Sequence, residues 1–535
     1  MYPPARILPK RKLPACISSA FFRTLELSSS FFMKSTSTKA LLEDYRSRMQ
    51  KIADLKFSSA VLQWDQETYL PPKGAEFRGQ QIATLTELAH QFFTDKELGS
   101  LLEEVVNRND LTVAEKRNFE LTREDFIKQQ KFTPAFVRRL SEATHRSFHN
   151  WIKARKENNF RFFADDLDTL VTLKIEEAEL LGYEGHPYNA LLNDHDKGAT
   201  VDLLSKTFTS IKEPLKELLK KIQQAEPIND SFLKQNYPKD TQWQFGLQVI
   251  KDMGYDMEAG RQDIAEHPFT ISFSSNDVRV TTRIDENDLS NMVWSCIHEA
   301  GHALYEQGLP ADQYGLPLGE AASFSIHESQ SRLWENHVGR SHSWCKYYLP
   351  ILQKEFPNQL GAVSLEDFYR GINKVHPSFI RTEADELTYH FHVMIRYEIE
   401  KALLTKEIKA IDVPAYWNEK YFEYMNISVP DDKTGCLQDV HWSHGSFGYF
   451  PTYSLGSFYA AQFYRKAIID HPSIDMEIKN GQFTSLLGWL KNEVFPFGRQ
   501  YSSEELCQKI SGEGLNTSHF LKYLFDKYQN IYHLD

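Results

Sequence analysis

The spacing of apolar residues constrains the fold of this chain more than any other feature. From about residue 38 onward, apolar residues recur at three- and four-residue intervals, which places them on one face of a helix. The pattern is clearest over residues 41–64, 80–93 and 201–222, and residues 114–163 form a charged amphipathic stretch broken only by Pro134. No low-complexity linker or solenoid repeat follows residue 40. We therefore predict a mostly α-helical fold, built as one large domain over residues 33–535.

The length and charge of the chain exclude several classes of protein. Its 535 residues are 41% hydrophobic and 25% charged, which is ordinary for a folded globular protein. The net charge of −12 argues against a nucleic-acid-binding protein, because binding to phosphates needs a basic surface. No run of about 18 apolar residues is present, so the sequence predicts no membrane-spanning helix. We expect neither nucleic acid nor a membrane as a partner.

The first 40 residues differ in composition from the rest of the chain. They contain seven Lys and Arg residues against one acid, Glu26, and three serines in a row at residues 28–30. Such a stretch is typical of a targeting segment, whereas Arg23 and Glu26 interrupt the apolar core that a secretory signal needs. The third alternative is an extension upstream of a functional start at Met33. We expect residues 1–32 to be a disordered extension, with organelle targeting as the open alternative.

The five cysteines give no sign of a metal or disulfide framework. They are widely spaced, odd in number and form no CxxC pair. We interpret them as free thiols, which favours a reducing compartment and a cytoplasmic protein.

One alternating stretch is typical of β-structure. Residues 269–273 and 278–284 alternate between apolar and polar side chains, and residues 274–277 between them are Ser-Ser-Asn-Asp. The pattern predicts two strands joined by a turn, immediately before the helix described next.

The most informative short motif is His298-Glu299-Ala300-Gly301-His302. Two histidines four residues apart lie on one helical face, so both imidazoles can reach one metal ion, and Glu299 can reach a water on that ion. Asp288 or Ser290 can cap this helix, and Gly308 followed by Pro310 ends it. The flanking residues are apolar almost all round, which predicts a buried helix whose polar side chains need a partner such as zinc.

A catalytic zinc site needs a third protein ligand. A second helix-like run over residues 321–338 contains Glu328 and Glu335, with Glu320 just before it, and spacing alone does not choose among the three. Arg332 follows Glu328 by four residues and is either a partner of that carboxylate or half of a surface ion pair.

Six ordered motifs make the chain resemble the M32 metallocarboxypeptidases, the carboxypeptidase Taq family, from about residue 38 to the end. The HExxH motif is one of them, and residues 64–69 also resemble the start of that family. The other matching motifs are His267-Pro268-Phe269, Asp277-Val278-Arg279-Val280-Thr281, His327-Glu328-Ser329-Gln330, Ile380-Arg381-Thr382-Glu383-Ala384-Asp385 and Gly435-Cys436-Leu437-Gln438-Asp439-Val440-His441-Trp442. Residues 1–32 do not resemble the family, which leaves the cellular location open.

The resemblance implies a large helical zincin-type metallopeptidase with a long deep active-site groove, a small β-hairpin or sheet near the zinc helix, and a homodimer. It implies Zn²⁺ held by His298, His302 and Glu328, with Glu299 as the catalytic base. Co²⁺ or Mn²⁺ are possible substitutes, because carboxylate and imidazole ligands accept them too.

The free carboxylate of a peptide substrate needs an anchor. Arg381 is our candidate, because a guanidinium matches a carboxylate bidentately, although an ion pair with Asp385 is an alternative. We expect His267 and His441 to hydrogen-bond the substrate or to be structural. Gln438 and Asp439 would orient His441 or contact substrate, and the hydroxyl of Tyr449 or Tyr453 would reach the oxyanion.

These observations predict a zinc carboxypeptidase that releases single C-terminal residues with broad specificity, but not next to proline. One alternative is an oligopeptidase or dipeptidyl carboxypeptidase on the same scaffold. Another is a non-catalytic peptide-binding protein, which the intact HExxH motif disfavours.

Overall fold

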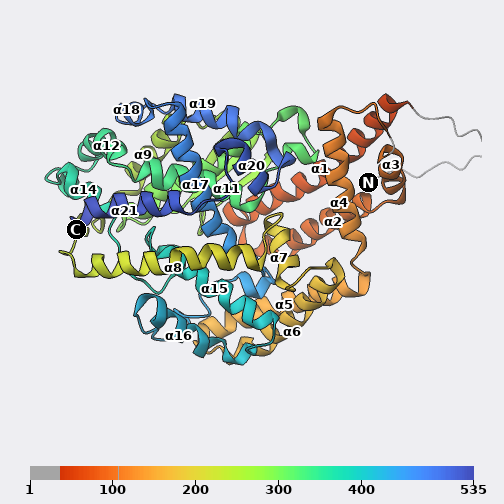
Figure 1. Ribbon diagram of the computed structural model, residues 1–535, viewed down its shortest axis with the longest axis horizontal. Coiled ribbons are helices and arrows are strands. Elements are labelled where there is room, and N and C mark those ends of the chain that lie inside the picture. Colours follow the sequence, from red (N-terminus) through yellow and green to blue (C-terminus); the bar gives the residue numbers. More distant parts are fainter. Residues whose placement is uncertain (1–36, 107, 535) are drawn as a thin grey trace, which may run out of the picture.

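The computed structural model describes residues 37–106 and 108–534, and most of these are helical (Figure 1). This confirms the predicted mostly α-helical fold; the extension predicted over residues 1–32 lies outside the described residues. The α-helices are α1 Thr38–Thr68, α2 Ala75–Phe93, α3 Lys96–Val106, α4 Val113–Gln130, α5 Pro134–Glu157, α6 Arg161–Leu181, α7 Tyr188–His195, α8 Val201–Gln224, α9 Lys239–Asp252, α10 Leu289–Gly308, α11 Phe324–Arg332, α12 His342–Glu355, α13 Pro357–Leu360, α14 Leu365–Ile372, α15 Tyr389–Leu404, α16 Val413–Met425, α17 Pro451–Asp470, α18 Ile474–Ile478, α19 Thr484–Glu493, α20 Ser503–Ser511 and α21 Ser518–Tyr532. A π-helix covers Leu333–Gly339, and short 3₁₀ turns cover Pro72–Gly74, Ser231–Leu233, Ala311–Gln313, Pro317–Gly319, Arg381–Glu383, Ala410–Asp412, His441–His444 and Phe495–Gln500.

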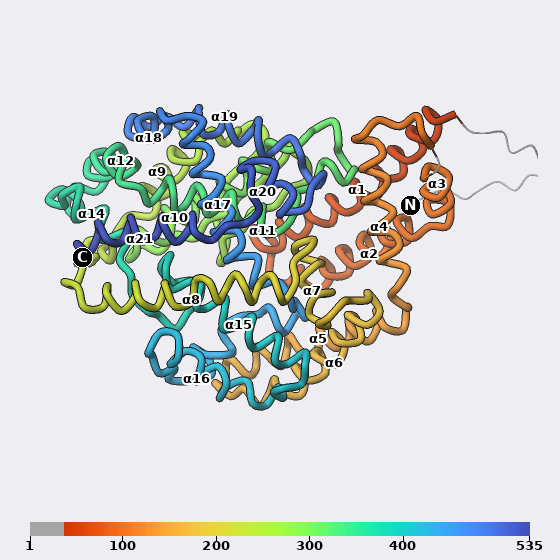
Figure 2. The backbone as a smooth tube through the Cα atoms, viewed as in Figure 1, coloured from red at the N-terminus to blue at the C-terminus, as the bar shows by residue number. Residues whose placement is uncertain are grey.

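The helices gather in groups around a central set. Helices α1 to α4 lie at one end of the elongated molecule, and α12, α14 and α18 lie at the opposite end (Figure 1). Between these ends, helix α11 packs against both α10 and α17 (Figure 2). Their buried side chains belong to one large hydrophobic core that continues from residue 151 to residue 532.

Pro134 separates two helices, as its position in the amphipathic stretch predicts. It occupies the first turn of α5, where a proline has no backbone hydrogen bond to lose, and the Thr133 side chain accepts a bond from Phe136 N at 3.2 Å.

A three-stranded sheet lies directly before α10 in the chain. Its strands are β1 Gly260–Ile264, β2 Thr270–Ser274 and β3 Asp277–Thr282, in the order β1-β3-β2. The antiparallel pair β2–β3 confirms the predicted hairpin. The parallel pairing of β1 with β3 was not expected, because the sequence Gly-Arg-Gln-Asp-Ile lacks the alternation and the β-branched residues of a typical strand. β2 is therefore an edge strand.

Helix α10 carries the HExxH motif and has the predicted boundaries. Asp288 caps it by accepting a bond from Ser290 N at 2.9 Å, and the helix ends at Gly308. Its buried residues surround most of the helix, as expected from the apolar flanks.

The helix expected over residues 321–338 is shorter and less regular. It begins at Phe324, because Ser323 caps it through a bond from Ile326 N, and at Leu333 it changes into the π-helix. The wider turn alters which side chains share a face. Apolar spacing does not predict this change, because it depends on what packs around the segment.

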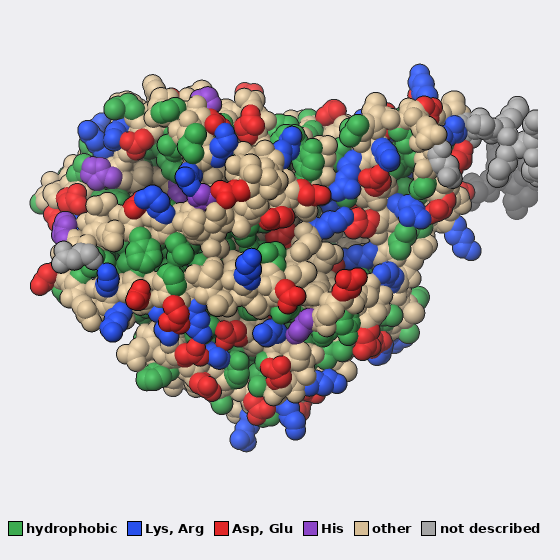
Figure 3. Space-filling model, in the orientation of Figure 1, with side chains coloured by type: hydrophobic (Ala, Val, Ile, Leu, Met, Phe, Trp, Pro, Cys, Tyr) green, Lys and Arg blue, Asp and Glu red, His purple; other side chains and the backbone are tan. Residues whose placement is uncertain are grey.

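The surface shows no single-sign patch on the face drawn in Figure 3, where Lys and Arg side chains are interspersed with Asp and Glu. Within residues 37–106 and 108–534, no helix is long and apolar enough to cross a bilayer. Cys296, Cys345, Cys436 and Cys507 are free and buried, as expected, and Cys16 lies outside the described part of the chain.

Candidate metal centre and active site

Two helices bring three metal-binding side chains together. His298 and His302 project from one face of α10, and Glu328 projects towards them from α11. Oε2 of Glu328 lies 3.8 Å from Nε2 of His298 and 3.4 Å from Nε2 of His302. One ligand atom from each side chain lies within 4.8 Å of the other two, close enough to hold one ion.

Two glycines allow this approach. A Cβ at Gly301, inside the HExxH motif, would lie 2.7 Å from Cα of Ser331 and 2.8 Å from the carbonyl oxygen of Gln330, so α10 and α11 could not pack this closely. A Cβ at Gly456 of α17 would lie 2.6 Å from both Cβ and Cγ of Glu328. Helix α11 therefore lies between two neighbouring helices, each of which has a glycine where it contacts α11.

The other nitrogen of each histidine has its own acceptor. Nδ1 of His298 donates to Glu335 Oε2 at 2.9 Å, and Nδ1 of His302 donates to the carbonyl oxygen of His327 at 2.9 Å. These bonds place a proton on each Nδ1 and leave each Nε2 lone pair on the side of Glu328. Such acceptors are what orient histidines at metal sites. The donor set thus fits a metal ion.

The protonation states of Glu328 and His302 also fit, whereas at His298 burial is outweighed by the neighbouring Glu328 and Glu335, which raise the pKa of the imidazole above its usual value. Burial alone would raise the pKa of Glu328, but Arg332 and the two histidines outweigh it and hold that pKa well below its usual range. Burial lowers the pKa of His302 to about 3, so this side chain is neutral at pH 7. A metal site needs an ionised carboxylate and neutral imidazoles.

Arg332 is a largely buried partner of Glu328 rather than half of a surface ion pair. Its Nε lies 2.7 Å from Oε1 of Glu328, and its Nη1 lies 3.2 Å from Oε2 of Glu335. The π-helix brings Glu335 to this position. Glu320 lies elsewhere, exposed and 3.2 Å from Arg499, so the structure groups only Glu328 and Glu335 of the three candidate glutamates with the histidines.

Glu299 lies beside the metal-binding group and is held by the sheet. Its Oε2 accepts a hydrogen bond of 2.6 Å from the hydroxyl of Thr270, at the start of β2. Burial raises the pKa of Glu299 above its usual value, which suits a carboxylate that takes up and returns a proton.

The guanidinium of Arg381 is buried against Asp439. Its Nε and Nη2 donate to Oδ1 of Asp439 at 3.0 and 2.9 Å, and its Nη1 donates to the hydroxyl of Tyr389 at 3.0 Å. The alternative partner Asp385 is not in contact with it, because its carboxylate accepts bonds from Thr388 and nearby backbone amides. One N–H on each of Nη1 and Nη2 is left to point elsewhere.

Tyr389 connects this arginine with the metal-binding group. The guanidinium carbon of Arg332 lies 4.5 Å from the centre of the Tyr389 ring, on the side of Glu328. A series of contacts, Glu328 with Arg332, Arg332 with Tyr389 and Tyr389 with Arg381, therefore links the metal-binding group to Arg381.

His441 and Tyr453 lie next to Arg381. Nε2 of His441 is 3.2 Å from the hydroxyl of Tyr453, and the guanidinium carbon of Arg381 is 4.8 Å from the centre of the Tyr453 ring. Burial, with the nearby Arg381, lowers the pKa of His441 to about 3, so it is neutral at pH 7. Tyr449 packs against both, with its ring centre 5.6 Å from that of His441 and 5.3 Å from that of Tyr453.

Gln438 and His267 have different surroundings. Oε1 of Gln438 accepts from the backbone N of Arg381 and from Arg396, and its Nε2 donates to three carbonyl oxygens, so its polar atoms are occupied by the chain itself. His267 is exposed between β1 and β2 and makes no hydrogen bond with any residue that the structure describes.

Three residues that hold site side chains in place were not predicted from the sequence: Thr270, Tyr389 and Arg396. Arg396 is fully buried and holds Oδ2 of Asp439, with its Nε at 2.7 Å. Thr270 follows the His-Pro-Phe motif directly, which is a signal that could have found it. No sequence signal singles out the other two.

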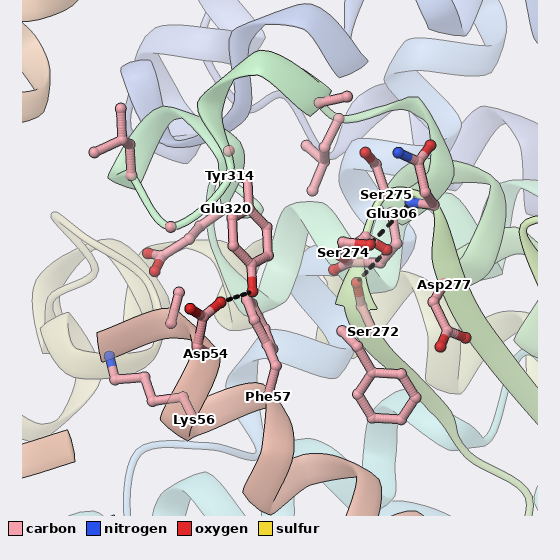
Figure 4. Close-up of a pocket in the computed structure, with 18 of the residues that line it drawn as sticks. Asp54, Lys56, Phe57, Ser272, Ser274, Ser275, Asp277, Glu306, Tyr314 and Glu320 are labelled. Carbon is pink, nitrogen blue, oxygen red and sulfur yellow. Dashed lines mark hydrogen bonds between the residues drawn. The ribbon is translucent and has the colours of Figure 1, made fainter. Parts of the chain in front are cut away.

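A cavity of about 950 Å³ opens next to this centre (Figure 4). It runs along β2 from Thr270 to Ser274 and on to Asp277, and α1 forms its opposite wall. Glu306, Tyr314 and Glu320 also line it, and the Tyr314 hydroxyl donates to Asp54 at 2.9 Å. Thr270, which donates to Glu299, is the lining residue that connects the cavity with the metal-binding group.

Comparisons with known proteins agree over nearly the whole chain. Residues 44–528 match the family described as carboxypeptidase Taq (M32) metallopeptidase. Carboxypeptidase 1 of Bacillus subtilis is 37% identical over 487 residues, covering 90% of this chain and 97% of that protein. Thermostable carboxypeptidase 1 of Thermus thermophilus is 38% identical over 500 residues, with the same coverage.

Solved structures show the same similarity. The crystal structure of an M32 carboxypeptidase from Deinococcus radiodurans superposes with a TM-score of 0.91 at 36% identity, covering 92% of this chain and 100% of that one. Together with the HExxH helix, the matched sequence and the matched fold show that this chain belongs to the M32 family of metallocarboxypeptidases and is a peptide hydrolase.

Proposed function

We propose that the protein is a zinc-dependent carboxypeptidase that removes single residues from the free C-terminus of peptides. The observation that carries this proposal is the group formed by the partly buried His298 and His302 and the buried Glu328, with Glu299 oriented beside it by Thr270. The ligand types, two imidazoles and one carboxylate, are those of catalytic zinc sites.

His298, His302 and Glu328 would hold the metal, which when bound supplies a Lewis acid that polarises the scissile carbonyl and acidifies a water molecule. Glu299 would take a proton from the attacking water and later give it to the departing amine. Thr270 keeps the Glu299 carboxylate in position for both transfers. Because Glu299 is buried, the proton is not lost to bulk solvent between the two steps.

Arg381 is the proposed anchor for the terminal carboxylate, with His441 and Tyr453 beside it. The free N–H groups on Nη1 and Nη2 form a fork that matches a carboxylate, while Asp439 holds the other edge of the guanidinium. Tyr453 or Tyr449 would donate to the developing oxyanion. His267 would contact substrate only if the segment between β1 and β2 closes over it.

The edge strand β2 is the proposed partner of the substrate backbone upstream of the scissile bond. Its outer edge faces the cavity, and an extended peptide can pair with such an edge. Main-chain pairing does not depend on side-chain identity, which supports broad specificity, and proline lacks the N–H that pairing uses.

The finer properties of the family are part of the same proposal. We infer a homodimer from the family resemblance, and a cytoplasmic location because the four described cysteines are free and buried. Size-exclusion chromatography with light scattering tests the first, and microscopy of the tagged full chain tests the second.

The test of the activity is a metal-dependence assay on a blocked dipeptide and a longer peptide. A chelator should abolish release of the C-terminal residue, and added zinc should restore it, with cobalt and manganese as comparison ions. Mass spectrometry should show stepwise loss of single residues that stops at a proline. Release of dipeptides, or internal cleavage, would instead identify a dipeptidyl carboxypeptidase or an oligopeptidase.

A further inference from the structure

A second cavity, of about 460 Å³, lies on the other side of the π-helix from the metal-binding group. Glu335 of this π-helix binds His298, whereas His337 and Arg340 line the cavity. Helices α17 and α21 form most of the remaining wall. The volume is within the range of small-molecule sites. None of the residues assigned to the active site lines it.

His337 is the feature of this cavity that most needs an explanation. Its side chain is 5% exposed, and neither ring nitrogen makes a hydrogen bond with any described residue. The ring lies between Tyr523 and Tyr464, with ring centres 4.0 and 5.0 Å away. Because burial lowers its pKa to about 3, it offers one neutral donor and one acceptor at pH 7. Its ring nitrogens are not among the fully buried unpartnered atoms, so they are accessible from the cavity, where a polar atom of a ligand would complete the site.

The wall of the cavity is rich in cations. Arg340, Arg465, Lys522 and Lys527 line it against one carboxylate, Asp526. Three of these cations have carboxylate partners: Arg340 binds Glu335, Lys522 binds Asp526 and Lys527 binds Glu386.

Arg465 has no carboxylate partner among the described residues. It donates to Nδ1 of His519, whose Nε2 lies 2.7 Å from Glu513, so most of its N–H groups are unused. Arg465 is exposed, and a ligand can reach it from solvent.

We propose that this cavity binds a small oxyanion carried on a planar ring. The oxyanion would bind Arg465 with Lys522 nearby, the ring would lie among Tyr369, Tyr464 and Tyr523, and a polar ring substituent would bond to His337. Carboxylate and phosphate share this chemistry. This inference is independent of the reaction at the metal centre.

The test is a binding titration of the metal-loaded full chain with three matched probes: 4-hydroxybenzoate, phenyl phosphate and the uncharged 4-hydroxybenzamide. At least one of the anions should bind, and 4-hydroxybenzamide should bind at least tenfold more weakly. Whichever anion binds more tightly identifies the head group as a carboxylate or a phosphate.

Two variants separate this site from anion binding at the metal centre. Arg465→Met should weaken the binding of the anion at least tenfold, because a hydrogen bond to a charged group is lost. The control is Lys491→Met, which replaces an exposed lysine of α19 and should leave the binding of the anion unchanged. His337→Phe should also weaken the binding of 4-hydroxybenzoate, with the metal content unchanged. Failure of both anions to bind the wild type, or equal binding by Arg465→Met, would overturn the proposal. Binding of 4-hydroxybenzamide as tight as that of the anions would also overturn the proposal.

Discussion

At the scale of single residues, the proposed base Glu299 is the first position to test. Glu299→Gln keeps the shape of the side chain and the hydrogen bond from Thr270, and it leaves His298, His302 and Glu328 untouched. We expect full metal content but a fall in kcat of about 10²–10⁴-fold, because the amide cannot take up a proton. Metal analysis and kcat on a blocked dipeptide measure both. Near-normal turnover in the metal-loaded variant would rule out Glu299 as the base.

Glu335 illustrates how a neighbouring carboxylate can matter without belonging to the metal-binding group. Glu335→Gln weakens the acceptor for Nδ1 of His298, so metal affinity should fall by about 10–100-fold. Glu320→Gln is the matched control, since Glu320 is exposed and pairs with Arg499. Competition with a chromogenic chelator gives both affinities, and equal values would show that Glu335 does not orient His298.

Arg381 is tested by substrates that differ only at the terminal group. Arg381→Ala should lower kcat/KM on free-acid peptides by at least about tenfold and have little further effect on the matched amides. Arg381→Lys should also be impaired, because lysine has no fork.

Arg396→Lys is the control for that experiment. Arg396 holds the same Asp439 but is fully buried, so it does not contact substrate, and its replacement should affect acids and amides equally. If Arg381→Ala also lowers kcat/KM equally on acids and amides, Arg381 is structural, and the anchor must be sought at Arg279 or His441.

At the scale of elements, the contact between α11 and α17 positions Glu328. Gly456→Ala would put a methyl group 2.6 Å from Cβ and Cγ of Glu328, which forces the helices apart. We expect a loss of about 1–3 kcal/mol in the free energy of unfolding and weaker metal binding. Gly488→Ala in α19 has no atom within 4 Å of the added carbon and should be neutral or slightly stabilising. Denaturant titration and chelator competition would show whether the two variants differ.

At the scale of the whole molecule, Asp196 joins three segments that are distant in sequence. It follows α7, and its carboxylate accepts bonds from Ser325 at the start of α11 and Ser503 at the start of α20. Burial raises the pKa of Asp196 to about 6 in the folded chain, above its ordinary value of 3.8. Because the folded state binds this proton more tightly than the unfolded state, the contribution of Asp196 to stability is greatest below about pH 4. It decreases as the pH rises through about 6.

Asp196→Asn should therefore change stability in a pH-dependent way. The amide is neutral at every pH, and the serine hydroxyls can rotate to hydrogen-bond with it. The variant should therefore become more stable relative to the wild type as the pH rises. The difference in unfolding free energy should change by up to about 3 kcal/mol between pH 4 and pH 8. Denaturant unfolding of both proteins across this range measures it, and a constant difference would show that folding does not raise the pKa of Asp196.

Local rules explain what the sequence alone determined. Interactions between near neighbours in the sequence account for four features: the spacing of His298 and His302 on one helical face, the cap at Asp288, the turn between β2 and β3, and the start of α5 at Pro134. A reader of the sequence can apply those rules without knowing what packs nearby. The six motifs indicated the family, and the family in turn indicated the general fold.

Tertiary packing decided the rest. Spacing left Glu320, Glu328 and Glu335 as equal candidates, and the close approach of α10, α11 and α17 at Gly301 and Gly456 brought Glu328 to the histidines. The π-helix places Glu335 against His298, and β1 pairs with β3 although β2 lies between them in the sequence. Arg381 pairs with Asp439, 58 residues further along the chain. Each of these depends on contacts between segments that are far apart in sequence, and helical periodicity carries no information about such contacts.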